Sequence, residues 1–252
     1  MNLIILTESD RTGDTTCRLT DHRAGHIRLI LKAAVGDTVE IGLLDGPVGT
    51  ARITTLDPDQ VVLDIVDLHD TPPPVPTIDL ILALPRPQTL KKVLLTSAMM
   101  GVRRLFLVRA NRVEKSYFHS PLLEPANYTP FLMEGLAQGK LTRLPEVSIH
   151  DRFRVFFEDT LANLYRDINR PDSTAPLRLL PDLDTDRDLS TVYDGTSPHL
   201  LIAVGPEGGW VPFEIETMQS LGFKRFTLGR STLRVEHAVT ATLAQLELLH
   251  HR

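Results

Sequence analysis

The spacing of apolar and polar positions changes at residues 71–76, which read Thr-Pro-Pro-Pro-Val-Pro. Four prolines in these six residues cannot continue a helix or a central strand, so they predict an extended spacer. Apolar runs before the spacer are short, and those after it are spaced as alternating strands and helices. We therefore expect one domain in residues 1–70, a Pro-rich linker at 71–77 and a second domain in residues 78–252.

The first region is typical of a small β-barrel. Its apolar runs are separated by the turn sequences Asp-Gly-Pro and Asp-Pro-Asp, which favour tight connections between strands. Strands are expected at residues 39–44, 50–56 and 61–68. Asp21 can accept hydrogen bonds from the first turn of a helix, so we expect a short helix after it that carries Ile27, Leu29, Ile30 and Leu31.

The second region alternates between strand-like and helix-like segments. We expect strands at residues 78–84, 103–108, 177–180, 200–204 and 226–228. We expect helices at residues 89–100, 121–141, 211–221 and 233–250. Strands that alternate with helices predict an α/β domain with a mostly parallel sheet and helices on both faces. The polar stretch at residues 182–197, rich in Asp and Thr, predicts an exposed loop.

Composition limits the class of protein. The chain has 252 residues, of which 42% are hydrophobic and 23% charged, as in ordinary globular proteins. Its apolar runs are too short to span a membrane, and its first residues lack the pattern of a signal peptide. The single cysteine, Cys17, excludes an intramolecular disulfide and a Cys-rich metal site. We expect a cytoplasmic protein with no membrane partner and no metal.

Charge leaves a nucleic-acid partner open. The net charge of −5 argues against a uniformly basic binder, but phosphate contacts depend on where Lys and Arg gather. Basic residues gather in three places: His22, Arg23, His26, Arg28 and Lys32; Lys91 and Lys92; and Arg103, Arg104, Arg109 and Arg112. Acidic residues gather at 57–70 and 182–188. Each basic cluster is either part of an RNA surface or ordinary solvated surface.

A glycine-rich segment, Val-Gly-Pro-Glu-Gly-Gly at residues 204–209, follows the expected buried strand at 200–204. Three glycines at the carboxyl end of such a strand let a ligand approach the backbone. In open α/β sheets, ligands also bind at that edge. The spacing is neither that of a dinucleotide-binding fingerprint nor that of a Walker loop. The alternative is a tight turn that binds nothing.

A second segment, at residues 228–236, repeats this arrangement. Leu228 and Gly229 end a strand, and residues 233–236, Leu-Arg-Val-Glu, open the last helix. A glycine loop that enters a helix exposes backbone N–H groups to a ligand. Glu236 in the first turn is a favourable partner of the helix dipole and can hold Arg234 in place. The alternative is a structural salt bridge between these two residues.

These two segments together resemble those of the SPOUT methyltransferases. Gly205 to Gly209, then Leu228-Gly229 and Leu233-Arg234-x-Glu236-x-Ala238, are most similar to the ribosomal RNA small subunit methyltransferase E family. Near the N-terminus, His26 to Lys32 and then Val35-Gly36-Asp37 resemble that family's His-x-x-x-Val-Leu-Arg and Val-Gly-Asp patterns. Residues 138–145 fall where the family carries an Arg-rich stretch before a proline.

The resemblance implies a fold and an activity. It implies an N-terminal PUA-like β-barrel for RNA and a C-terminal α/β domain with a trefoil knot, a topology too rare for a strand pattern to predict. It further implies that the cofactor is S-adenosyl-L-methionine and that the protein is a homodimer. The partner would be 16S rRNA or the small ribosomal subunit, and the reaction would be methyl transfer to N3 of one uridine.

The resemblance also assigns residues. The residues expected to hold the cofactor are Leu180, Gly205, Pro206, Glu207, Gly208, Gly209, Leu228, Gly229 and Leu233. Arg234 would stabilise the imide anion that develops when the uridine N3 proton is lost, and Glu236 would orient it. The base must be exposed or flipped to reach this pocket. The residues expected to contact RNA are His26, Arg28, Lys32, Arg112 and Arg143.

Five positions depart from the family pattern: Met100, Ala137, Leu141, Ser231 and His237. They replace residues at which the family carries Glu, Glu, Arg, Arg and Thr. The first four changes remove charged side chains that could contact RNA or a second subunit. Two alternatives therefore stay open beside the rRNA methyltransferase: a catalytically silent RNA-binding paralogue, and a methyltransferase with a different RNA target.

Overall fold

The computed structural model describes residues 2–69, 77–165 and 175–250. The expected linker at 71–77 therefore lies outside the described residues except for Thr77. The chain forms two compact units. Unit 1 is Met1–Val75 with Met133–Leu144, and unit 2 is Pro76–Leu132 with Pro145–Arg252. Thus a short later segment of the chain belongs to the first unit, which the spacing of apolar positions did not predict.

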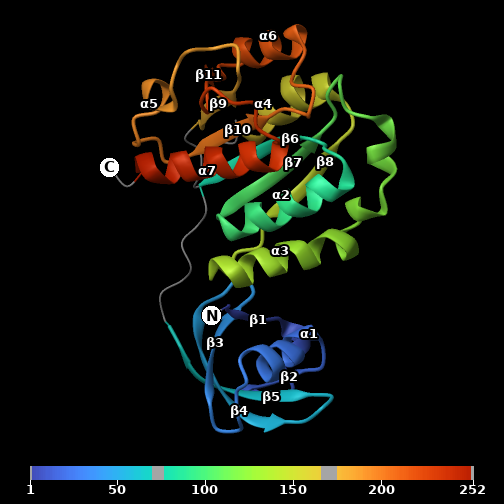
Figure 1. The fold of residues 1–252 in the computed structure, drawn as a ribbon, viewed down its shortest axis with the longest axis vertical. Coiled ribbons are helices and arrows are strands. Elements are labelled where there is room, and N and C mark those ends of the chain that lie inside the picture. The colour runs from blue at the N-terminus through green and yellow to red at the C-terminus, as the bar shows by residue number, and fades with distance from the viewer. Residues whose placement is uncertain (1, 70–76, 166–174, 251–252) are drawn as a thin grey trace. The chain divides into compact units, whose positions relative to one another are not determined.

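Unit 1 contains a five-stranded sheet of order β1-β3-β4-β5-β2. In this sheet β1 and β3 pair parallel, and the other neighbouring strands pair antiparallel. Figure 1 shows these elements in blue and cyan. The elements are β1 (Ile4–Leu6), η1 (Glu8–Asp10), β2 (Thr16–Leu19), α1 (His22–Gly25), η2 (His26–Ile30), β3 (Thr38–Leu43), β4 (Val48–Leu56) and β5 (Val61–Leu68).

The core of unit 1 follows from alternation along the long strands. In β4, Ala51 and Ile53 are fully buried, whereas Arg52 and Thr54 are exposed and Thr50 is half-buried, as expected for a sheet with one face in the core. The later segment completes the unit. The Leu3 backbone N–H donates to the Ala137 carbonyl at 2.9 Å, and the Thr142 hydroxyl donates to the Gly46 carbonyl at 2.6 Å.

Unit 2 is built on a six-stranded sheet of order β11-β9-β10-β6-β7-β8, and every neighbouring pair is parallel. Its strands are β6 (Ile78–Ala83), β7 (Val102–Val108), β8 (Glu146–His150), β9 (Leu177–Pro181), β10 (Leu200–Val204) and β11 (Lys224–Phe226). Its helices are α2 (Pro87–Met99), η3 (Lys115–His119), η4 (Pro121–Leu123), η5 (Val155–Thr160), α4 (Leu161–Leu164), α5 (Leu189–Val192), α6 (Pro212–Ser220) and α7 (Val235–His250); α3 (Pro125–Gly139) runs from unit 2 into unit 1.

Both faces of this sheet are covered. All five residues of β10 are buried, and successive side chains of a strand point to opposite faces. On one face α2 and α7 lie side by side (Figure 1). On the other, the Phe156 ring of η5 packs against the Phe106 ring of β7, with 5.4 Å between centroids. The predicted α/β fold with a parallel sheet is confirmed.

Several expected boundaries differ from the structure. The last strand ends at Phe226 rather than residue 228, and β8, η5 and α4 were not expected. The prediction of an exposed loop at 182–197 is wrong in its middle, where Leu189 and Val192 of α5 are buried, as is Tyr193, which follows the helix in an extended conformation. Leu189 and Val192 are three residues apart and so lie on one face of the helical turn, and burial outweighs the polar composition around them.

Two findings concern functional classes. In the described parts of the chain, no helix has the length and apolar character needed to cross a membrane. Among the same residues, no three His, Cys, Asp or Glu side chains form a group suited to a metal ion.

Candidate functional site

The glycine-rich loop joins β10 to α6. Because the sheet of unit 2 is parallel, the loops after β7, β9, β10 and β11 all leave it at the carboxyl edge. Gly209 has φ +72° and Gly229, after β11, has φ +127°, which are values that favour glycine. At Gly205 a Cβ would lie only 3.0 Å from Nε1 of Trp210, so a larger residue would push against the ring. A Cβ on Gly229 would meet nothing within 4 Å, so its loop borders open space.

Glu214 ties the start of α6, just after the glycine-rich loop, to the loop after β7. Only 3% of this residue is exposed, and it lies in the first turn of α6. Its Oε2 accepts from the backbone N–H of Val211 at 3.0 Å, and its Oε1 accepts from the backbone N–H of Asn111 at 2.6 Å. The carboxylate therefore caps the helix and ties it to the loop after β7. Sequence analysis missed this residue, although Pro at the helix start with Glu two residues later is a recognised start signal.

Arg112 joins the loop after β7 to the glycine-rich loop. It is exposed in the loop after β7, and its guanidinium donates a hydrogen bond to the Gly208 carbonyl. A Cβ on Gly208 would lie 3.0 Å from Cδ of Arg112, so the glycine gives this side chain room to pass. The residue was expected to contact RNA, and the structure places it at the glycine-rich loop.

Glu236 and Arg234 do not contact each other in the structure. The Glu236 carboxylate accepts from Nζ of Lys92 on α2 at 3.0 Å, and the residue is 8% exposed. Burial raises the pKa of Glu236, but its own backbone N–H and Lys92 lower it further, so the pKa lies below the ordinary value. Arg234 is exposed, and no hydrogen bond or ion pair of its guanidinium occurs among the described residues. The expectation that Glu236 orients Arg234 directly is therefore not met, because Lys92 from another helix takes the carboxylate.

The apolar residues expected at the cofactor site differ in burial. Leu180 is fully buried in β9, Leu228 is half-buried, and Leu233 is 37% exposed. The Thr227 hydroxyl accepts from the Gly229 N–H at 3.1 Å and donates to its carbonyl at 3.0 Å, which shapes the turn between them. In the glycine-rich loop Pro206 is buried and Glu207 is exposed. The loops thus combine apolar side chains with an exposed backbone.

The RNA-contact residues expected in unit 1 have different environments. Arg28 donates to the Asp57 carbonyl at 2.7 Å and to the Pro58 carbonyl, which ties η2 to the turn between β4 and β5. Lys32 is exposed. His26 and Arg143 are half-buried, and one ring or guanidinium nitrogen of each, Nε2 and Nε, has no hydrogen-bond partner among the described residues.

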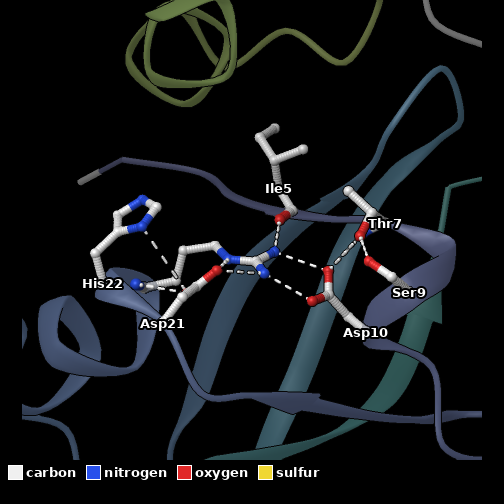
Figure 2. Close-up of polar contacts among 7 residues, drawn as sticks. Ile5, Thr7, Ser9, Asp10, Asp21 and His22 are labelled. Atoms are coloured by element: carbon white, nitrogen blue, oxygen red, sulfur yellow. Dashed lines mark hydrogen bonds and ion pairs between the residues drawn. The ribbon is translucent and has the colours of Figure 1, made fainter. Parts of the chain in front are cut away.

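Arg23 belongs to the same basic cluster in the sequence. Its guanidinium forms ion pairs with Asp10 and Asp21, the two aspartates labelled in Figure 2. Its guanidinium donates to Asp10 at 2.6 and 2.8 Å, to Asp21 at 2.8 Å and to the Ile5 carbonyl at 2.6 Å. Burial raises the pKa of Asp10, but the hydrogen bonds from Arg23 and Thr7 outweigh it and hold the pKa below its usual value. This arginine serves the fold of unit 1.

Arg103 and Arg104 form a second internal network, at the amino edge of the sheet in unit 2. Arg103 contacts the buried Asp79 through two hydrogen bonds, of 2.9 and 2.7 Å. Arg104 lies 3.8 Å from the same carboxylate and 3.3 Å from Glu146. The Tyr165 hydroxyl donates to Asp79 at 2.5 Å, and burial together with that carboxylate raises the pKa of the tyrosine. In the third basic cluster of the sequence, Arg103 and Arg104 therefore belong to an internal ionic network, unlike Arg112.

The positions that depart from the family pattern lie in three places. Ser231 and His237 are exposed, in the loop before α7 and in its first turn. Met100 ends α2, and Ala137 and Leu141 belong to unit 1. Ser231 and His237 are each three residues from Arg234 in the sequence.

A parallel α/β unit with glycine loops at the carboxyl edge of its sheet belongs to the class of ligand-binding α/β domains. Residues 71–247 match the model of the RNA methyltransferase domain. The chain therefore belongs to the RNA methyltransferase domain family.

Known proteins similar to the chain agree with this assignment. It is 28% identical to the ribosomal RNA small subunit methyltransferase E of Treponema pallidum, over 97% of this chain and 90% of that protein. It is 24% identical to ribosomal RNA small subunit methyltransferase E 1 of Borreliella burgdorferi, over 97% of this chain and 95% of that protein.

Solved structures with the same fold include two complexes. The ribosomal RNA small subunit methyltransferase E of Neisseria gonorrhoeae, bound to S-adenosyl methionine, superposes with a TM-score of 0.74 at 20% identity and 98% coverage of both chains. A methyltransferase of Legionella pneumophila, also in complex with this cofactor, gives 0.72 at 18% identity and 98% coverage of both chains. At these identities the likeness concerns the fold.

Proposed function

We propose that the protein is an S-adenosyl-L-methionine-dependent methyltransferase that acts on N3 of a uridine in 16S rRNA. The observation that carries the proposal is the pair of glycine loops at the carboxyl edge of the sheet, in a chain that belongs to an RNA methyltransferase family. The similarity to ribosomal RNA small subunit methyltransferases E over nearly the whole chain supports rRNA as the acceptor.

The residues of the two loops fit the cofactor. Gly229 leaves open space where a Cβ would stand, and the backbone N–H groups of Glu207 and Gly208 have no hydrogen-bond partner among the described residues. Backbone donors of this kind suit the polar atoms of an adenosine, and the half-buried Leu228 with the exposed Leu233 provides apolar contact. When bound, the sulfonium cofactor supplies an activated methyl group, so the protein mainly positions the reactants.

Arg234 is the proposed catalytic residue. Uridine N3 must lose a proton, and a nearby guanidinium stabilises the imide anion that develops. Its side chain is exposed and forms no hydrogen bond or ion pair with the described residues, so its guanidinium is available for an acceptor base. Glu236 is then a positioning residue, since its contact with Lys92 holds the first turn of α7, which follows Arg234 directly.

Further parts of the proposal concern the assembly. We propose that unit 1 is a PUA-like barrel that contacts RNA through Lys32 and its neighbours, that the loops of unit 2 form the trefoil knot of SPOUT proteins, and that the protein acts in the cytoplasm as a homodimer. These parts rest on the family resemblance. Light scattering during size-exclusion chromatography tests the dimer, because a mass near 28.1 kDa, that of one chain, would contradict it.

Methyl transfer from labelled cofactor to unmodified small-subunit RNA tests the activity. The expected result is one methyl group per RNA, found as 3-methyluridine after digestion to nucleosides. Incorporation at another nucleoside would favour a different RNA target. RNA binding without any incorporation would favour the silent paralogue and overturn the proposed reaction.

A further inference from the structure

We propose that arginines that follow β7 and β8, together with one exposed phenylalanine in the first turn of α6, bind the single-stranded RNA that flanks the target base. This arginine surface consists of Arg109, Arg112, Arg152, Arg154 and Phe213. The inference rests on the proposed function, and it deepens that function by naming the part of unit 2 that holds the acceptor.

The residues of the arginine surface come from the loop after β7, the segment after β8 and the first turn of α6. The Arg109 backbone N–H donates to the His150 carbonyl at 2.9 Å, which joins the start of the loop after β7 to the end of β8. Arg112 donates to the Gly208 carbonyl, which joins the loop after β7 to the glycine-rich loop. The Arg154 guanidinium lies 4.8 Å from the centroid of the Phe213 ring in the first turn of α6. The surface therefore borders the proposed cofactor site.

The charge of this surface is not neutralised within the protein. None of its four arginines forms an ion pair with a carboxylate among the described residues. Asp151 and Glu207 stand in the same loops and are exposed, and neither pairs with these guanidinium groups. In a chain of net charge −5, arginines left without carboxylates at one edge form a local site for phosphate.

Phe213 gives the surface a face on which a base can stack. Its side chain is 44% exposed although it is large and apolar, and Phe153 packs beside it with 6.3 Å between ring centroids. The guanidinium of Arg154 already lies over this ring. Aromatic rings flanked by arginines are the means by which proteins hold single-stranded nucleic acid, because bases stack and phosphates pair. This combination of charge and aromatic exposure favours RNA over a protein partner.

RNA affinity of the full-length protein, measured by fluorescence anisotropy at several salt concentrations, tests the inference. The ligand is a labelled single-stranded fragment of small-subunit RNA. The variants are Arg152→Gln with Arg154→Gln, and separately Phe213→Ala; all three side chains are exposed, so the fold is retained. Lys224→Gln, which removes an exposed cation at the amino end of β11, is the matched control.

The double variant is expected to weaken binding by about tenfold or more and to reduce the salt slope by about 1.4, since each lost phosphate contact on a single strand contributes about 0.7. Phe213→Ala is expected to weaken binding by about 5- to 100-fold with little change in slope, as for loss of base stacking. Lys224→Gln is expected to change neither.

Unchanged affinity and slope in the double variant would overturn the arginine surface while leaving the methyltransferase intact. Weakened binding to whole small subunits, with unchanged binding to naked RNA, would show that the surface serves a protein partner and would also overturn it. Methyl incorporation by the unchanged protein is measured in parallel. Absence of methyl incorporation would count against the proposed function. The affinity measurements test the arginine surface separately, because they require no methyl transfer.

Discussion

Two pairs of arginines that follow one another closely in sequence end at opposite edges of the same parallel sheet. Arg103 and Arg104, at the start of β7, are nearly buried and contact Asp79 and Glu146. Arg109 and Arg112, after the end of β7, have no carboxylate partner among the described residues. One strand therefore separates a closed ionic network from an open basic surface.

The difference is consistent with the proposed functional site at the carboxyl edge of the sheet. A buried carboxylate that is satisfied by two arginines and a tyrosine stabilises one arrangement and offers nothing to a ligand. Cations whose partners are only a backbone carbonyl or an aromatic ring keep their charge for an incoming anion. The same contrast holds in unit 1, where Arg23 is bound by two aspartates and Lys32 is exposed.

The largest expected effect is at the closed edge. Asp79→Asn leaves the guanidinium of Arg103 without its charged partner in a site where Asp79 is 1% exposed. We expect the free energy of unfolding to fall by about 3–5 kcal/mol, because a buried cation loses its compensation. Urea denaturation measures this, with the exposed Asp186→Asn as control. A loss as small as that of the control would mean that the network does not hold the sheet.

The next effect is expected at the open edge. Arg234→Ala removes the proposed stabiliser of the imide anion, so turnover should fall by about 100- to 1000-fold. Binding of the cofactor should change by only a few-fold, since the proposed cofactor contacts come from backbone groups of the glycine loops, and stability should not change because the side chain is exposed. Single-turnover kinetics and calorimetry separate these quantities. Cofactor affinity that fell as far as turnover would contradict the assignment of Arg234 to the reaction.

Local features of the sequence predicted the parallel sheet and both glycine loops, because strand–helix alternation and glycine at strand ends are readable over a few residues. The contacts that divide the arginines were not readable in this way. Lys92 and Glu236 are 144 residues apart, and Arg112 and Gly208 are 96 apart. Such pairs can be predicted only when the strand order is known. The sequence alone therefore favoured Arg234, two residues away, as the partner of Glu236.

The buried carboxylate of Glu214 holds the start of α6 to the loop after β7, at the carboxyl edge of the sheet. The variant Glu214→Gln tests how far that edge depends on it. The two backbone N–H groups bind different oxygens of the carboxylate, and in glutamine an NH2 donor takes the place of one of these oxygens, so one hydrogen bond is lost. The free energy of unfolding should fall by about 1.5–3 kcal/mol, as for loss of a charge-assisted hydrogen bond. Cofactor affinity should fall by about tenfold or less, because the loop loses one of its two ties. Glu216→Gln, exposed on the same helix, is the control, and equal effects of both would show that the cap is not needed.

The smallest effect concerns the ion pair of unit 1 and is expected in acid. Burial raises the pKa of Asp10, but Arg23 and Thr7 hold it below the unfolded value of 3.8. A depressed folded pKa contributes stability that is fully present above the unfolded pKa and is lost as the pH falls through the folded one. The stability of the unchanged protein should therefore decline below about pH 4 more steeply than that of Asp10→Asn, which lacks this titration. Urea unfolding between pH 6 and pH 3 compares the two, and Asp14→Asn, an exposed neighbour, should follow the unchanged protein. Parallel pH curves for all three proteins would mean that Arg23 does not stabilise the ionised form of Asp10.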